Sequence, residues 1–155
     1  MKKLFVAICV AFISIAASAQ IKGDLTAGVH AVYGDKIETL GFGVDVQYCF
    51  TDQIRIDGGW TYWLKKNDVT TNALDANLHY LFNLGVQDKL YAYPLAGLNY
   101  TKSSFQGHSD GEIGINLGGG VQYALQDNLD LRGEVKYILG DLKQVVIGAG
   151  VIYHF

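Results

Sequence analysis

The sequence predicts an all-β fold, an eight-stranded antiparallel up-and-down β-barrel. Three observations lead to it. Eight segments alternate apolar and polar residues with a period of two, the pattern of a strand with one apolar face. No segment shows a sustained helical period. The connections are short enough for consecutive strands to pair directly, and an even number of strands returns both ends of the chain to one side, as in a closed barrel.

The first residues are set apart from this fold. Lys2 and Lys3 precede an apolar run over residues 4–15, and small residues follow at positions 17–19. This is the pattern of a secretory signal peptide. The run is too short to cross a bilayer as a helix, and no later stretch approaches the roughly 20 continuous apolar residues that a crossing needs. We expect a signal peptide at residues 1–19 and one barrel domain at residues 20–155.

The eight segments follow one another with few residues between them. They cover residues 25–33, 40–48, 54–62, 74–82, 90–100, 113–123, 129–137 and 145–155. Connections 51–53, 83–89 and 126–128 are expected on the side of the termini, and connections 34–38, 65–72, 101–112 and 140–143 on the opposite, external side. Strands of about 9–11 tilted residues span a membrane, so eight of them account for the domain.

The composition of the two faces indicates which one points outward. Among the lysines after residue 19, only Lys136 lies well inside a strand, so the polar face would make a poor solvated surface. The apolar face carries aromatic residues near both strand ends, as the two interfaces of a bilayer select. We expect an aromatic girdle of Tyr48, Tyr80 and Tyr123 at one end and Tyr33, Trp60, Tyr62, Tyr100 and Tyr137 at the other. In the alternative, a soluble periplasmic ligand-binding barrel, the apolar face lines a pocket.

The polar face would then line the lumen. It carries charged and imidazole side chains at residues 24, 30, 45, 55, 57, 75, 79, 130, 132, 134, 136 and 154. The interior of an eight-stranded barrel has room for side chains and little else, and unpaired buried charges cost several kcal/mol each. We therefore expect a lumen plugged by an ion-pair network of Asp45, Arg55, Asp57, Arg132, Glu134 and Lys136. A tight turn at residues 51–53 would place Arg55 opposite Gln47. The alternative is a narrow channel for ions or small solutes.

The sequence offers little support for nucleic-acid binding, disulfides, metal or cofactor sites, or catalysis. Residues 20–155 carry more acidic than basic side chains, which disfavours nucleic acid as a partner. Cys49 is the single cysteine of that part, so neither a disulfide nor a cysteine-based metal site is expected, and no cofactor. The strongest enzymatic candidate is His108-Ser109-Asp110, which places a His, a Ser and an acid together in connection 101–112. A nucleophile needs a base within hydrogen-bond reach, which adjacent residues seldom provide, so we expect a solvated loop and no enzyme.

The export signal, the eight amphipathic segments and an ending with Val151, Tyr153 and Phe155 in one register resemble the small outer-membrane β-barrels of the OmpA/OmpX type. In that family the barrel-assembly machinery recognises the closing strand and its terminal Phe. The resemblance therefore implies that Val151, Tyr153 and Phe155 form an assembly signal. It also implies an outer-membrane location, contact with lipid and lipopolysaccharide, and a structural or surface-interaction role in membrane integrity or adhesion. A few barrels of this type are lipid A-modifying enzymes, which is the alternative that His108-Ser109-Asp110 would support. We expect a monomer.

Overall fold

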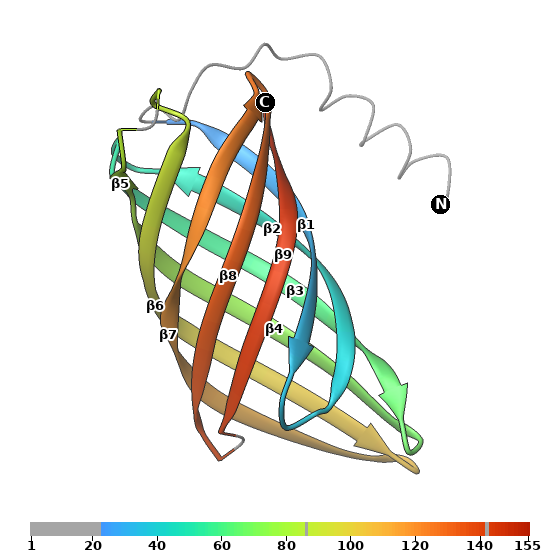
Figure 1. The fold of residues 1–155 in the computed structure, drawn as a ribbon. Coiled ribbons are helices and arrows are strands. Elements are labelled where there is room, and N and C mark those ends of the chain that lie inside the picture. The colour runs from blue at the N-terminus through green and yellow to red at the C-terminus, as the bar shows by residue number, and fades with distance from the viewer. Residues whose placement is uncertain (1–22, 86, 142) are drawn as a thin grey trace.

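The computed structural model describes residues 23–85, 87–141 and 143–155, so the expected signal peptide lies outside the described part. One antiparallel sheet closes on itself into a barrel (Figure 1). Its elements are β1 Leu25–Gly34, β2 Thr39–Cys49, β3 Ile54–Lys66, β4 Val69–Tyr80, β5 Phe82–Asn83, β6 Leu90–Phe105, β7 His108–Gln126, β8 Leu129–Gly140 and β9 Gln144–His154. No helix long and apolar enough to cross a membrane occurs in the described residues.

The nine elements make eight barrel strands, because β4 and β5 lie in one strand. β4 pairs with β6 as far as His79 opposite Leu95, and β5 resumes in the same register with Phe82 opposite Ala92. Between them, Pro94 of β6 has no N–H to donate to the ladder. The closed eight-stranded antiparallel barrel that the sequence predicts is therefore confirmed, with β1 paired to β9 and β4 to β6.

The register sets the width of the barrel. A row of paired residues that starts at Leu25 of β1 passes once around the barrel to Val145 of β9. There the carbonyl of Val145 accepts from the backbone N–H of Asp35, so the row returns displaced along β1. Eight strands with such a stagger tilt by roughly 35–45° and enclose an interior about one layer of side chains wide.

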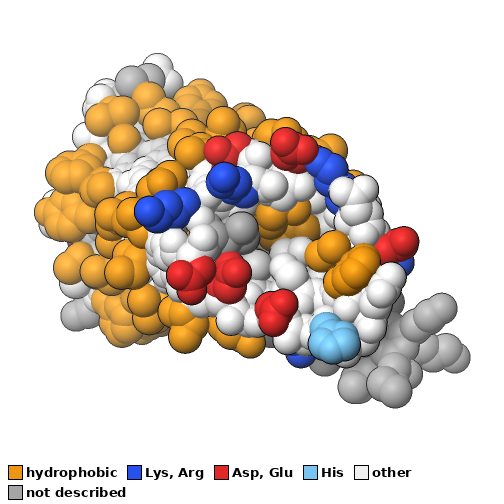
Figure 2. Space-filling view, turned by 90° about the horizontal axis from the view of Figure 1, so that it is seen from below, with side chains coloured by type: hydrophobic (Ala, Val, Ile, Leu, Met, Phe, Trp, Pro, Cys, Tyr) orange, Lys and Arg blue, Asp and Glu red, His pale blue; other side chains and the backbone are white. Residues whose placement is uncertain are grey.

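The apolar face of every strand points outward. In β2, Phe42, Val44 and Val46 are each more than half exposed, whereas the alternate residues Asp45 and Gln47 are buried. Figure 2 shows the resulting apolar outer wall, with charged side chains of both signs around the mouth. The expected girdle residues lie on this outer face, with Tyr48, Tyr80, Tyr123, Tyr33, Trp60, Tyr100 and Tyr137 exposed and Tyr62 partly so.

The bounds expected for two of the connections, 65–72 and 101–112, are wrong. The β3–β4 turn consists of Asn67 and Asp68, and the β6–β7 turn of Gln106 and Gly107, so most of residues 65–72 and 101–112 is strand. All four turn residues have positive φ, as two-residue hairpin turns with the correct twist require. The apolar alternation ends before the strands do, because the residues next to these two turns are mostly polar on both faces of the strand.

Candidate functional site

The lumen gathers the polar side chains of all eight strands. Successive side chains of a strand point to opposite faces, so one residue in two points inward. The largest fully buried side chains include Arg55, His79, Gln47, Gln122, Gln144 and Asn116, all polar, while the large aliphatic residues mostly lie outside. This arrangement inverts that of a soluble domain, in which such polar groups are mostly exposed.

Arg55 of β3 anchors the layer of the lumen nearest the chain termini. Its guanidinium approaches Nδ1 of His79 at 3.2 and 3.0 Å and donates to Oε1 of Gln122 at 2.8 Å. The guanidinium carbon also lies 5.1 Å from the centre of the Tyr93 ring, which stacks on His79. These contacts surround the buried cation with uncharged acceptors and an aromatic face.

The expected cross-strand pairing of Arg55 with Gln47 is wrong. Arg55 stands opposite Cys49, and Asp57 takes the place opposite Gln47. The reason lies in the β2–β3 turn, where Thr51 Oγ1 accepts from the backbone N–H of Ile54 at 2.9 Å. Because the turn consists of residues 51–53 alone, the ladder starts with Phe50 opposite Ile54, which places Arg55 opposite Cys49. A pairing of Arg55 with Gln47 would need a longer turn, over residues 49–53. Cys49 itself is a buried free thiol.

The centre of the lumen is held by one ion pair. Arg132 of β8 donates to both carboxylate oxygens of Asp45 of β2, at 2.6 and 3.2 Å. The same carboxylate lies 2.9 Å from Nδ1 of His30 and accepts from Gln47 at 2.6 Å. Nε2 of His30 in turn lies 3.1 Å from Oγ1 of Thr61. Every oxygen of this buried carboxylate therefore has a partner.

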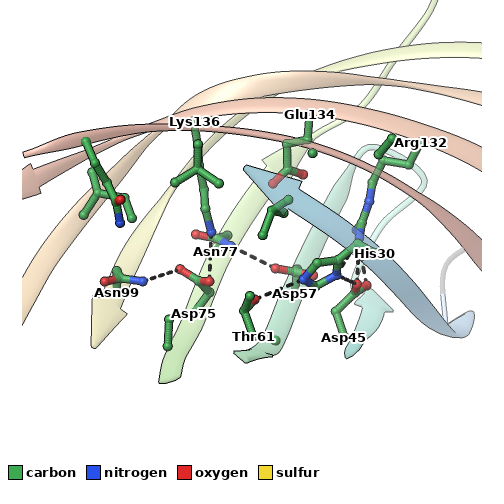
Figure 3. A pocket seen from close by; sticks show the side chains of 18 of the residues that line it. His30, Asp45, Asp57, Thr61, Asp75, Asn77, Asn99, Arg132, Glu134 and Lys136 are labelled. Carbon is green, nitrogen blue, oxygen red and sulfur yellow. Dashed lines mark hydrogen bonds and ion pairs between the residues drawn. The ribbon is translucent and has the colours of Figure 1, made fainter. Parts of the chain in front are cut away.

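Figure 3 shows that β8 faces β2, β3 and β4 across the lumen, so that three side chains of β8 point toward three aspartates. Lys136 forms the second ion pair, 2.8 Å from Asp75, which also accepts from Asn99 and Asn116. The carboxylates of Asp57 and Glu134, which lie between these two ion pairs, accept from neutral donors. Asp57 accepts from Asn77 at 2.9 Å, and Glu134 from the hydroxyl of Tyr93 at 2.9 Å.

The six residues expected to form one network are therefore divided among several contacts. Among them, only Asp45 and Arg132 form an ion pair with each other. Period two places Asp75 and the histidines in the lumen, but their partners depend on the stagger between distant strands. The sequence prediction misses Tyr93, Asn77 and Gln122 as partners, since an uncharged side chain on the inner face carries no signal of its own. The clue in the sequence is that each of them stands at a position of its strand whose side chain points inward.

A small cavity lies among these side chains. Its volume is about 40 Å³, and His30, Asp45, Asp57, Thr61 and Glu134 are part of its lining. A cavity needs about 10–15 Å³ per water, so about three waters fit. Asp45, His30 and Thr61 follow the order of a hydrolytic triad, beside a space that holds about three waters. The described residues contain no group of three or more His, Cys, Asp or Glu placed to hold a metal ion.

The other expected sites lie outside the lumen. His108, Ser109 and Asp110 begin β7, so strand alternation turns Ser109 away from the other two side chains and the trio is not brought together. The residues of the expected assembly signal lie on the outward face of the closing strand. Tyr153 and Phe155 pack edge to face with ring centres 5.4 Å apart.

Comparison with known proteins gives the same architecture. The N-terminal β-barrel domain of Pseudomonas aeruginosa OprF is 18% identical and has a TM-score of 0.74, with 86% of this chain and 98% of that chain covered. Neisserial surface protein A is 20% identical with a TM-score of 0.62 and coverage of 91% and 100%. Ail of Yersinia pestis is 17% identical with a TM-score of 0.61 and coverage of 87% and 100%. At these identities the likeness shows the fold.

No curated protein matches the chain. A family model, described as the outer membrane protein beta-barrel domain, matches residues 5–155. That match covers nearly the whole sequence, and it agrees with the apolar outer wall and polar lumen of the closed barrel. The chain therefore belongs to the outer membrane protein beta-barrel domain family.

Proposed function

We propose that this chain is exported, resides in the outer membrane, and acts as a structural barrel whose lumen is filled by its own side chains. The observation that carries the proposal is the inverted packing: apolar side chains cover the outside while Arg55, Gln122 and Asn116 are wholly buried within. A lipid bilayer is the solvent that such a wall requires. The hairpin end, opposite the termini, would face the exterior, with Lys36, Lys65, Lys66, Lys102 and Lys143 placed to meet lipopolysaccharide.

Two measurements test this proposal. Membrane fractions washed with carbonate should retain the protein, and detergent extracts should contain a band whose electrophoretic mobility changes on boiling. Recovery in the soluble periplasmic fraction would refute a membrane role. Reconstituted protein should give no resolvable current in planar bilayers. A steady current that changes in Arg55→Ala or Glu134→Ala would favour the narrow channel instead.

A specific feature of the hairpin end favours surface contact as a second function. β7 pairs with β8 only from Gly114, opposite Gly140, onward. Among the described residues, 108–113 therefore pair with β6 alone, and Ile113, on the outward face, is 72% exposed. An unpaired strand edge is a template for an added strand. One of the structural relatives, Ail, is named as an attachment invasion locus protein.

Shortening this hairpin tests the surface function separately. Replacing residues 103–110 with Asn-Gly would connect Lys102 directly to Gly111, which are already paired, and leave the barrel register intact. Cells carrying the shortened protein should adhere less than cells with an equal surface amount of the original. Phe105→Ala is the matched control, because it removes the exposed aromatic ring of the tip and keeps the strand edge. Equal adhesion of the shortened and original proteins would refute this function.

A further inference from the structure

The wall formed by β3, β4, β6 and β7 projects beyond the rest of the barrel at the hairpin end. Within the described part of the chain, the β2–β3 ladder stops at Trp63, whereas β3 and β4 stay paired as far as Lys66. The β7–β8 ladder stops at Gly114, whereas β6 and β7 stay paired as far as His108. Figure 1 shows the β6–β7 hairpin ending well apart from the β8–β9 turn. The projecting wall therefore has two free edges, at residues 64–66 of β3 and at residues 108–113 of β7.

The two edges differ in their protection against another strand. Lysine, proline and bulges are devices that keep an edge strand from pairing. The β3 edge carries Lys65 and Lys66, and Lys66 donates to Glu38 of the β1–β2 turn. The β7 edge has no lysine or proline over residues 108–113, and its ladder with β6 has no register shift. The β7 edge therefore lacks the protection that the β3 edge has.

The backbone of the β7 edge has hydrogen-bonding groups to offer. The carbonyl of Lys89 accepts from the N–H of Ala124, so even-numbered residues of β7 direct their backbone groups toward β6. The β6–β7 register has no shift, so this alternation holds along the ladder and odd-numbered residues point the other way. Ser109 and Gly111 therefore each direct an N–H and a C=O to the open side, where no described strand pairs with them.

The side chains on the inner face of this edge favour a basic strand. Asp110 and Glu112 stand two residues apart, so both point to that face. Neither forms an ion pair within the described residues, and the residues opposite them in β6 are Ser103 and Thr101. Asp141, the residue after β8, adds a carboxylate at the base of the edge. A strand with Lys or Arg at alternate positions would bring cations opposite these acids, and such cross-strand pairs stabilise a sheet.

The outward face of the edge favours apolar residues in the added strand. The Tyr100 ring lies over Gly111, since a Cβ atom at Gly111 would lie 3.0 Å from Cε2 and Cζ of that ring. Ile113, on the same face, is 72% exposed. Residues that stand opposite Gly111 and Ile113 would therefore have an isoleucine and an aromatic ring as neighbours.

We propose that residues 108–113 of β7 bind an extended segment of another protein, about six residues long, with Lys or Arg at every second position and apolar residues between them. The segment would continue the sheet beyond Gly140 of β8. This inference rests on the surface contact proposed above for the β6–β7 hairpin and adds the chemistry of the partner. Backbone bonds to Ser109 and Gly111 would supply affinity, and Asp110 and Glu112 would select basic segments.

Binding of synthetic peptides tests the proposal. The probe is a fluorescent hexapeptide of alternating Lys and Val, added to the folded protein in phosphatidylcholine nanodiscs. One control peptide has the same residues as a block of Lys followed by a block of Val. The other is the alternating peptide with N-methyl groups on its Val amides, which keeps the charge and removes the donors that would face β7. Fluorescence anisotropy should show about tenfold tighter binding of the alternating peptide than of either control.

Variants of the β7 edge separate backbone from charge. Ser109→Pro removes an N–H that points away from β6, so the β6–β7 ladder stays intact and peptide binding should weaken about tenfold. Ser109→Ala is the matched control, because it loses only the 2.9 Å side-chain bond to Ser104 and keeps the N–H. Asp110→Asn combined with Glu112→Gln should weaken binding about threefold or more. In the original protein, bound peptide should slow hydrogen exchange at the amides of Ser109 and Gly111.

Equal binding of the three peptides, or unchanged binding to Ser109→Pro, would overturn the proposal, since charge alone would then hold the peptide. Self-association of the barrel that Ser109→Pro abolishes, without peptide binding, would place a second copy on the edge and would also overturn it. Each variant is first checked for the heat-shifted band, so these results concern folded barrels. Failure of the surface function would appear separately, as equal adhesion of cells that carry the shortened hairpin.

Discussion

Burial, rather than distance, should decide the strength of an ion pair in this barrel. Arg132 and Asp45 approach to 2.6 Å with side chains 6% and 2% exposed. Lys66 and Glu38 approach to 2.5 Å, but their side chains are 41% and 64% exposed. Removing one partner of a buried pair costs about 3–5 kcal/mol, because the other charge stays buried, whereas an exposed pair contributes about 0–1 kcal/mol. Arg132→Met should therefore lose about 3–5 kcal/mol of unfolding free energy, and Lys66→Met at most about 1 kcal/mol.

A double-mutant cycle measures the buried pair by itself. Urea unfolding of the reconstituted barrel is followed by tryptophan fluorescence and by the fraction of the heat-shifted band. Asp45→Asn combined with Arg132→Met should be less destabilising than the two single losses together, with a coupling of about 2 kcal/mol. His30 and Gln47 remain as hydrogen-bond partners for the amide that Asp45→Asn introduces. Equal losses in Arg132→Met and Lys66→Met, or additive effects in the double variant, would refute the reasoning.

Three further predictions concern packing, assembly and pH. Gly97→Ala should prevent folding in most of the population, because its Cβ would clash with the backbone oxygen of Ala76, whereas Gly58→Ala should fold normally; the heat-shifted band checks both. Deleting Phe155 should lower recovery in the outer membrane, while Phe50→Ala, an outward aromatic at the same end, should not; equal recovery would count against the assembly signal. The Lys66 ammonium lowers the pKa of the exposed Glu38 carboxyl, by hydrogen bond and by charge. The small stabilisation that this ion pair gives the folded barrel is therefore present above the unfolded-state pKa of Glu38 and is lost as the pH falls through its folded-state pKa. Acid titration should bring the original and Glu38→Gln proteins to equal stability.

The fold follows from local sequence information more completely than the site does. Leu40, Phe42, Val44 and their polar neighbours suffice to predict a strand and its lipid face, because alternation is a property of one segment. Partners inside the lumen depend on the stagger around the whole barrel. Arg55 is the clearest case, since the β2–β3 ladder extends two residues farther along β2 than expected and places Arg55 opposite Cys49, while its partners His79 and Gln122 come from β4 and β7. Where lipid ends, the alternation ends too, and the polar continuation of β6 and β7 resembles a loop.

The pairing of β1 with β9 has a consequence for the order of events during biogenesis. Thr26 stands opposite His154, so the first strand finds its second neighbour only when the final strand is available. Until then the sheet has two bare edges, and its outer side chains are exposed to water. Such an open sheet is prone to aggregate with other chains. Contacts so distant in sequence also form slowly. The nascent chain should therefore depend on a holding chaperone throughout its passage to the membrane.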